Sequence, residues 1–405
     1  MNQADTVFIL AAAGLVLLMT PGLALFYAGM VRGKNVLGTM MQSLFMISLI
    51  SIEWVYLGYS MSFGPTIGGF VGDLSWFGLN TVTSAPSPDY ATTIPQNVFM
   101  IYQCMFAIIT PALITGAFAE RVRFVPFILF SILWAVFVYN PVCHWIWSKS
   151  GWLGALGVMD FAGGLVVHAT CGMAALAGVL VIGPRRGYGR TNFMPHSLPM
   201  TVIGTGLLWF GWFGFNGGSA LAADEVAATA FVATHLAGMA GMATWVVLEW
   251  KFQGKPTTLG AASGAIAGLA TITPTAGFVG PNVAILVGLL GCTFCYTFVS
   301  MKGRFNLDDS LDVVGIHGVG GLVGTICLGL FASTVVNPGG VDGLFAGNPG
   351  QLVSQIIGVV VVSVYAFTVS WVIFKIIDST IGLRLSDEAE VAGMDSAEHS
   401  ETAYN

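Results

Sequence analysis

Two histidines with matching surroundings are the residues in this sequence best suited to chemistry. His168 follows Asp160 by eight positions in DFAGGLVVHATCG, and His317 follows Asp309 by eight in DSLDVVGIHGVGG. In a helix that rises ~1.5 Å per residue, His168 lies about 12 Å from Asp160, deep within an apolar segment. A histidine at such depth is costly unless it faces a pore or a partner, so the pattern predicts a functional pair.

An internal symmetry between the two segments would bring the imidazoles together near the membrane midplane. They would then hydrogen-bond to each other, leaving one ring nitrogen of each free for a solute. The alternative is two unrelated packing histidines. A zinc site needs three or four ligands, and Asp160 is a turn or more too far along its helix, so no metal is predicted. With no nucleophile–base pair or phosphate loop in the sequence, we expect neither an enzyme nor a cofactor.

The segments that must hold these histidines are long and apolar. Hydrophobic residues make up 55% and charged residues 8% of the 405, whereas a soluble domain carries roughly 25% charged residues. Runs of about 20 apolar residues are long enough to span a bilayer. Eleven such stretches are present, at 7–31, 38–63, 95–119, 124–147, 160–183, 197–217, 225–250, 257–276, 281–301, 312–334 and 349–378. We therefore expect an all-α integral membrane protein with eleven transmembrane helices, the first of them retained rather than cleaved.

The loops indicate which side of the membrane each helix end faces. With the N-terminus outside, thirteen of the fourteen Lys and Arg residues fall on the inner side, and Lys149 alone falls outside. Cytoplasmic loops are enriched in Lys and Arg, so an N-out, C-in topology is predicted. A transmembrane domain of residues 1–378 is then followed by a polar, acidic cytosolic tail, residues 379–405.

The aspartate–histidine spacing is also an internal repeat. Its two copies begin the fifth and tenth predicted spans, so they are five spans apart. An odd number of spans reverses the orientation of the second copy, as in transporters built from two inverted repeats. We expect inverted five-helix repeats over about residues 7–183 and 197–334, with 349–378 as an eleventh helix outside them.

Several motifs resemble those of the ammonium transporter family, which comprises ammonium transporters, methylammonium permeases and Rhesus proteins. These motifs are FYAGMVRGKN (26–35), FAIITPALITGAFAERVRF (106–124), DFAGGLVVH (160–168), GWFGFNGGSA (211–220), GAIAGLATITP (264–274) and DVVGIHGVGG (312–321). The resemblance covers nearly the whole chain. It implies eleven helices, an N-out topology, two inverted five-helix repeats and a homotrimer with one pore in each protomer.

Carried over by motif position, the resemblance also implies a set of site residues. The pore pair is His168 and His317. Trp147, Phe106 and Ser219 would recruit ammonium at the outer side, and Phe106 and Phe215 would form a phenylalanine gate. Asp160 would be a supporting carboxylate that bonds backbone amides, and Trp212 and Thr273 would line an apolar lumen. Two positions depart from the family's pattern. Lys149 places a cation near the mouth, which should weaken recruitment unless it points to bulk water, and Tyr102 could add a hydroxyl to the vestibule.

The expected function is transport of ammonium across the plasma or inner cell membrane. Ammonium, or methylammonium, would be held by aromatic ring faces, deprotonated, and conducted as the neutral base through a dry lumen, with or without its proton. One alternative is an ammonium sensor whose tail signals to a cytosolic partner, for which the family suggests the trimeric PII regulatory protein. Another is a neutral gas channel of the Rhesus type. No nucleic acid partner is expected.

Overall fold

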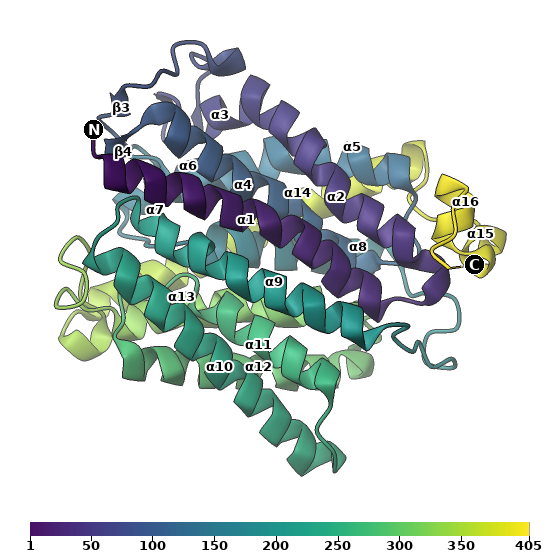
Figure 1. Ribbon diagram of the computed structural model, residues 1–405. Helices are drawn as coiled ribbons and strands as arrows, with labels where there is room; N and C mark the ends of the chain where they lie inside the picture. Colours follow the sequence, from purple (N-terminus) through teal and green to yellow (C-terminus); the bar gives the residue numbers. More distant parts are fainter. Residues whose placement is uncertain (405) are drawn as a thin grey trace.

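The long helices lie side by side in one bundle, with the N-terminus at one end and the C-terminus at the other (Figure 1). The computed structural model describes residues 1–404. In the first half the helices are α1 Gln3–Met30, α2 Val36–Glu53, α3 Tyr59–Phe63, α4 Gln96–Ile114, α5 Phe124–Trp134, α6 Asn140–Trp147, α7 Trp152–Ala155 and α8 Thr170–Ile182. In the second half they are α9 Leu198–Gly217, α10 Glu225–Gln253, α11 Thr258–Ile272, α12 Pro281–Met301, α13 Val319–Phe331, α14 Pro349–Thr380, α15 Asp387–Ala392 and α16 Met394–His399.

Shorter elements continue or connect these helices. Four π-helical segments are η2 Trp54–Gly58, η5 Ala135–Tyr139, η6 Gly164–Ala169 and η9 Val314–Gly318. The 3-10 turns are η1 Gly33–Asn35, η3 Phe77–Leu79, η4 Thr115–Phe118, η7 Gly218–Ala220, η8 Lys302–Phe305 and η10 Leu344–Ala346. Two antiparallel hairpins, β1 Thr66–Ile67 with β2 Val71–Gly72 and β3 Pro86–Ser87 with β4 Ala91–Pro95, lie in the connection between α3 and α4.

Ten helical stretches within residues 1–404 are long and apolar enough to cross a membrane. They occur in the order that the sequence predicts. The remaining predicted span, 257–276, contains α11, which has 15 residues and at ~1.5 Å per residue is shorter than a hydrocarbon layer of about 30 Å. The prediction of an all-α membrane protein is confirmed, with ten to eleven apolar helices.

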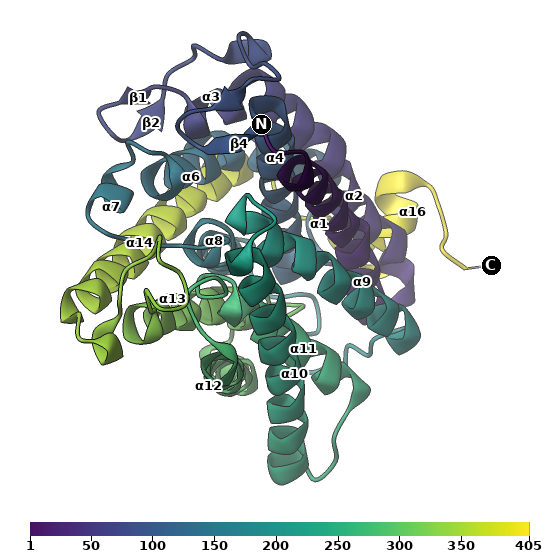
Figure 2. The same cartoon turned by 60° about the vertical axis from the view of Figure 1, so that its left-hand side comes forward.

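Glycines allow the helices to pack closely enough to enclose a narrow interior. Helices α1 and α9 pack against each other, and a Cβ atom placed on Gly204 of α9 would lie 2.3 Å from the backbone nitrogen of Phe26 on α1. Only a residue without a side chain permits this approach, which is typical of helix packing in lipid. Helix α8, which follows His168, lies in the interior of the bundle between α14 and the group of α9, α10 and α11 (Figure 2).

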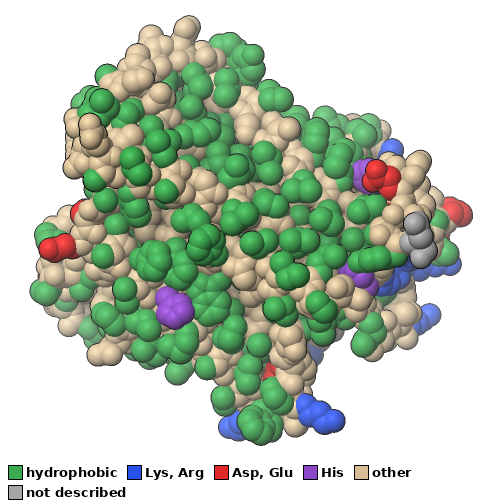
Figure 3. Space-filling model, in the orientation of Figure 1, with side chains coloured by type: hydrophobic (Ala, Val, Ile, Leu, Met, Phe, Trp, Pro, Cys, Tyr) green, Lys and Arg blue, Asp and Glu red, His purple; other side chains and the backbone are tan. Residues whose placement is uncertain are grey.

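The surface of the bundle matches a membrane environment. The face formed by α1, α9 and α10 carries few charged side chains across its middle, and Lys and Arg gather at the end where the C-terminus lies and at the far end of α10 (Figure 3). Apolar side chains such as Val7, Phe210, Val247 and Val364 are exposed on the helices. This is the distribution expected where lipid, rather than water, surrounds the middle of the molecule.

The fifth and tenth spans begin later than predicted, because an aspartate ahead of each one accepts bonds from its first turn. Asp160 accepts from four backbone N–H groups, those of Gly163, Gly164, Leu165 and Val166, at 2.7 to 3.0 Å. Asp309 accepts from the N–H groups that begin the tenth span, at 3.0 and 2.8 Å. Both aspartates therefore lie outside the helical spans, whose membrane-crossing parts begin at Gly164 and Val314.

A buried ion-pair network joins the loops at the C-terminal end of the bundle. Glu120 pairs with Arg32 at 3.0 Å and with Arg185 at 3.1 Å, and Arg185 pairs with Asp308 at 2.7 Å. Burial raises the pKa of the Glu120 carboxyl, but hydrogen bonds and charge from the two arginines outweigh it and hold this pKa below its usual value. The same balance, set by Arg185 and Arg121, lowers the pKa of Asp308.

The substitution Glu120→Gln is expected to destabilise the protein, because it leaves the buried charge of Arg185 short of a partner. Removing one member of a buried pair costs about 3–5 kcal/mol. A carboxyl whose pKa is lowered by folding stabilises the native state above its ordinary pKa, and this contribution disappears as the pH falls through the lowered value. The Tm of the wild type in detergent should therefore fall in acid, and that of E120Q should start lower and depend less on pH. The exposed pair of Asp387 with Arg186 provides the control D387N, and equal Tm values for E120Q and D387N would contradict the prediction.

The chain after α14 folds back onto the end of the bundle that holds the Glu120 ion-pair network. Lys34 donates to the carbonyl of Glu390 at 2.8 Å, and the N–H of Gly38 donates to Asp395 Oδ1 at 2.8 Å. The Arg384 guanidinium also donates to Glu390. This segment is thus held by backbone and side-chain hydrogen bonds, and α16 packs against the start of α2.

Candidate functional site

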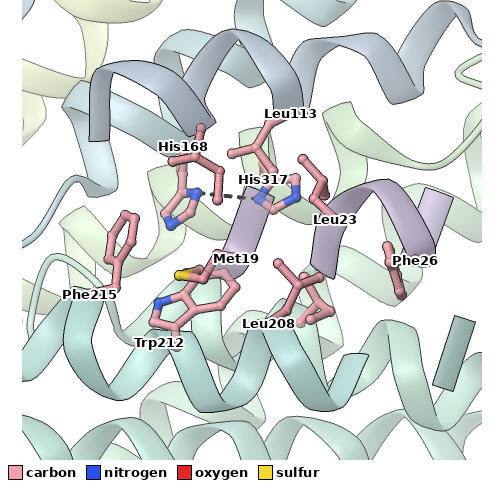
Figure 4. A pocket seen from close by; sticks show the side chains of 11 residues that line it. Met19, Leu23, Phe26, Leu113, His168, Leu208, Trp212, Phe215 and His317 are labelled. Atoms are coloured by element: carbon pink, nitrogen blue, oxygen red, sulfur yellow. Dashed lines mark hydrogen bonds between the residues drawn. The ribbon is translucent and has the colours of Figure 1, made fainter. Parts of the chain in front are cut away.

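The two repeat-related histidines meet in the interior of the bundle. His168 is in η6 and His317 in η9, and their Nδ1 atoms are 3.2 Å apart (Figure 4). The ring centroids are 5.2 Å apart with an angle of 20° between the planes. Both side chains are buried, and within residues 1–404 Nε2 of His168 has no hydrogen-bond partner.

This geometry constrains the protons of the pair. A bond between two Nδ1 atoms requires one ring to donate and the other to accept, so the donating ring has a bare Nε2 and the accepting ring carries its proton on Nε2. Which ring donates is a matter of tautomer. In either case the pair offers a passing solute one acceptor and one donor. Ammonia, which has both N–H donors and a lone pair, matches both.

A narrow apolar cavity surrounds the pair (Figure 4). It measures about 10 Å³ and is lined by Met19, Leu23, Phe26, Ile109, Leu113, His168, Leu208, Trp212, Phe215, Ile266 and His317. A cavity needs at least about 10–15 Å³ to hold one water molecule. A hydrated ion therefore does not fit, and a bare ion would lose its hydration with no countercharge to replace it.

Trp212 forms part of the cavity wall, and its indole packs near-parallel to the His168 ring at 5.5 Å. Thr273 does not line the cavity, contrary to the sequence-based expectation. Its hydroxyl accepts a hydrogen bond from the Trp212 indole N–H at 2.9 Å and donates to the carbonyl of Leu269 at 2.9 Å. Thr273 therefore satisfies the indole from behind and leaves the apolar ring face towards the cavity.

A wider cavity of about 200 Å³ lies on the other side of Phe215. Its lining residues are Phe63, Asp89, Tyr90, Phe99, Gln103, Phe106, Trp147, Phe161, Ser219 and Leu221. The structure thus brings Trp147, Phe106 and Ser219 together, although they come from three different helical elements. Below we call this cavity the vestibule, defined by these ten residues.

Two phenylalanine rings separate the vestibule from the histidine cavity. Phe106 lines the vestibule and Phe215 lines the histidine cavity, and their centroids are 4.3 Å apart with a tilt of 37°. Trp147 meets Phe106 edge to face at 5.9 Å. No polar side chain lies between the two rings in contact, so passage between the cavities requires the rings to move.

Tyr102 supports the vestibule from behind and does not line it. Its hydroxyl lies 3.0 and 2.9 Å from the carbonyl oxygens of Gly214 and Phe215 and 3.2 Å from Ser219 Oγ. Ser219 in turn donates its proton to the Phe215 carbonyl at 2.8 Å. The Ser219 oxygen therefore keeps lone pairs for a donor in the vestibule, and the expectation that Tyr102 adds a vestibule hydroxyl is wrong.

Asp160 connects the two cavities without lining either one. Its carboxylate binds the first turn of η6, which carries His168, and its backbone carbonyl accepts the Trp147 indole N–H at 2.7 Å. Gly163, with φ of 115°, allows the chain to curl around the carboxylate. One residue thus sets the positions of both the Trp147 indole and the His168 imidazole.

Beside the vestibule, Lys149 and Asp89 form an ion pair at 2.6 Å. Asp89 lines the vestibule, and the side chains of Lys149 and Asp89 are 64% and 45% exposed. The amine of Lys149 thus neutralises an acid that would otherwise attract cations.

From the resemblance to ammonium transporters, we expect Lys149→Gln to lower the apparent KM for ammonium about twofold at low salt, since exposed pairs are worth roughly 0.2–1 kcal/mol. Asp89→Asn, which frees the lysine, should raise it by a similar factor, and both effects should shrink at high ionic strength as screening increases. Currents from proteoliposomes at two salt concentrations measure this. Shifts in the same direction for both variants would contradict it.

The chain matches the model of the Ammonium Transporter Family over residues 7–404. It belongs to this family. The chain is 50% identical over 405 residues to an ammonium transporter of Bacillus subtilis, covering 100% of this chain and 99% of that protein. It is 46% identical over 404 residues to the ammonium transporter Amt1 of Archaeoglobus fulgidus, covering 100% of both. The crystal structure of Candida albicans Mep2 superposes with a TM-score of 0.91 at 38% identity, covering 96% of this chain and 87% of that one.

The protein is therefore a multi-pass membrane transporter of ammonium and not an enzyme. The family resemblance read from the sequence is confirmed, as is ammonium transport. The paired histidines in a narrow cavity are consistent with the twin-histidine pore of such a transporter.

Some lining residues of the transporter were missed by sequence reasoning. Met19, Leu23 and Phe26 of α1 face the histidine cavity, and their spacing of four and three places them on one helix face. That periodicity was visible in the sequence, but many apolar faces in a membrane protein share it. Gln103 of the vestibule lies one helical turn before Phe106, and this spacing was its only signal.

Proposed function

We propose that this transporter recruits ammonium in the outer vestibule, deprotonates it at the phenylalanine gate and conducts ammonia past the twin histidines. The observation that carries the proposal is the hydrogen-bonded pair His168–His317 in a cavity of about 10 Å³ with otherwise apolar walls. The predicted roles of Trp147, Phe106, Ser219, Phe215, Asp160 and Trp212 are part of this proposal, and Thr273 enters it as the residue that holds the Trp212 indole from behind the cavity.

Recruitment rests on the vestibule's aromatic faces and one hydroxyl oxygen. A cation over the face of Trp or Phe gains about 0.5–2 kcal/mol, and the Ser219 oxygen adds one acceptor. These interactions are weak enough to release the ion again, as transport requires.

Deprotonation follows from the change of environment at the gate. Moving an amine into a buried apolar site lowers its pKa by up to about 3–5 units, because the charged form loses its hydration. The N–H bond then breaks with its electron pair retained by nitrogen, and the proton passes either to vestibule water or onward through the histidine pair. Potassium has no proton to lose, so the same cavity excludes it without a size filter.

The test is an ammonium concentration jump on proteoliposomes adsorbed to a solid-supported membrane. A transient current above that of empty liposomes indicates charge movement, and light scattering or an internal pH dye detects neutral ammonia flux. Current sustained with a protonophore present supports conduction with the proton. Ammonia flux without current supports the neutral Rhesus-type channel, and the absence of both, with ammonium binding retained, supports a sensor.

The orientation and assembly form a second part of the proposal. We infer eleven spans with the N-terminus outside, two inverted repeats over about residues 7–183 and 197–334, and a transmembrane domain of 1–378 followed by a cytosolic tail. The matching placement of Asp160 before η6 and Asp309 before η9 supports the inverted repeat. A homotrimer and a PII-type regulatory partner are inferred from family membership. Cysteine accessibility at Lys149 and Arg186 from either side tests the orientation, and mass measurement in detergent tests the trimer.

A further inference from the structure

Gln103 lines the vestibule with a side-chain amide that makes no hydrogen bond within the described residues. It projects from α4 one turn before Phe106 and lines the vestibule together with Phe106, Trp147 and Ser219. Only 9% of its surface is exposed. Within residues 1–404 its Oε1 atom has no hydrogen-bond partner, and its amide nitrogen donates no hydrogen bond to a neighbouring residue.

An amide in that position needs an explanation. A buried polar group left without a partner costs about 1–3 kcal/mol, and nearly all such groups in native proteins are satisfied. The other polar vestibule groups have partners: Ser219 bonds Phe215 and Tyr102, Tyr90 bonds Phe63, and Asp89 bonds Lys149. Gln103 lines the vestibule, and its Oε1 is enclosed without a partner. A half-turn about the terminal bond exchanges the oxygen and nitrogen of a side-chain amide, so this carbonyl can turn to a solute in the vestibule.

Counting ligands suggests which solute. Ammonium has four N–H groups, directed to the corners of a tetrahedron. The ring faces of Trp147 and Phe106 accept two, and the Ser219 oxygen accepts a third. We propose that the Gln103 side-chain carbonyl accepts the fourth N–H, and that this fourth ligand makes the vestibule prefer ammonium to methylammonium. The inference rests on the recruitment role proposed above for this vestibule.

The preference follows from stoichiometry. Methylammonium has three N–H groups, so three ligands satisfy it and a fourth adds little. Ammonium with only three ligands keeps one N–H without a partner in a largely desolvated site. Removing Gln103 should therefore weaken ammonium binding much more than methylammonium binding, whereas a purely structural loss would weaken both equally.

The matched substitutions are Gln103→Leu, which keeps the volume but removes the acceptor, and Gln103→Glu, which places a carboxylate oxygen at the same distance from the backbone. Gln96→Leu is the control, because Gln96 is on the same helix, bonds Tyr59 and does not line the vestibule. Each variant is purified, reconstituted and tested in ammonium and methylammonium jumps, recording apparent KM and maximal current for both amines.

Q103L is expected to raise the ammonium KM about tenfold, the loss typical of one hydrogen bond to a charged group, with methylammonium changed less than about twofold. Q103E should lower the ammonium KM, and Q96L should change neither. If Q103L does not fold, the ammonium KM of Q103E is compared with that of Q96L instead. Equal factors for the two amines, or an unchanged ammonium KM, would overturn the inference. A wild type without any ammonium-driven current or flux would instead refute the proposed function.

Discussion

Replacement of Asp160 with alanine is expected to abolish ammonium transport. The substitution leaves four backbone N–H groups at the start of η6 without acceptors, in a turn that is buried between helices. At about 1–3 kcal/mol for each unsatisfied buried donor, the turn cannot keep its shape. Trp147 and His168 then lose their positions together, because the Trp147 indole bonds the Asp160 carbonyl and His168 is carried by η6.

The measurement separates loss of function from loss of fold. Reconstituted D160A should give no ammonium-driven current, and its Tm in detergent should fall by several degrees. Asp224, which caps α10 by accepting one backbone N–H at 2.9 Å, provides the control D224A, for which a typical cap cost of about 1 kcal/mol and retained transport are expected. Asp160→Asn, which keeps an acceptor of the same shape, should retain more activity than D160A. Normal transport by D160A would show that the turn does not position the site.

Alanine at either His168 or His317 is expected to reduce the ammonium-driven current at least tenfold. Each imidazole is the hydrogen-bond partner of the other at 3.2 Å, and the remaining wall of the cavity is apolar apart from a satisfied indole. Removing one ring leaves the other unpaired and takes away one of the two groups that can bond ammonia or relay a proton. Losing such a bond in a desolvated site costs about 1–3 kcal/mol, and each ~1.4 kcal/mol lowers the rate tenfold.

The control for this pair is another histidine on a membrane helix. The His235 side chain is exposed on the surface of α10, where its ring contacts those of Trp209 and Phe213. H235A should transport normally. Currents in H168A and H317A are compared with neutral flux measured by an internal pH dye, so that a loss of charge coupling can be told from a blocked cavity. Unchanged currents in both histidine variants would rule out the proton-path role.

The phenylalanine gate explains why a solute meets the vestibule residues first and the two histidines afterwards. Phe106 and Phe215 are in contact at 4.3 Å between a vestibule of about 200 Å³ and a cavity of about 10 Å³. A solute thus leaves a space that admits water for one that barely admits a single molecule. The charge of the solute becomes unfavourable at that boundary, before it reaches the histidines.

Much of the membrane architecture could be predicted from the sequence because lipid imposes simple rules. Apolar length determines which segments span the bilayer, and the distribution of Lys and Arg indicates orientation, so neither inference requires knowledge of contacts. The repeated spacing of Asp160 to His168 and Asp309 to His317 also pointed to a symmetric pair. These signals are local in the chain, and each is strong because its violation costs several kcal/mol in hydrocarbon.

Side-chain direction and distance between segments were decided only by the tertiary structure. His168 and His317 are 149 positions apart, and their contact depends on how η6 and η9 cross. Thr273 turned out to bond Trp212 from behind the cavity, Tyr102 to support Ser219, and Gln103 to line the vestibule. In each case the residue type was compatible with several partners, and the packing of neighbouring helices selected one. The sequence by itself thus determined that the protein spans a membrane and carries paired imidazoles, whereas the fold decided which polar atoms meet the solute and which only hold others in place, because that depends on distances that no residue encodes alone.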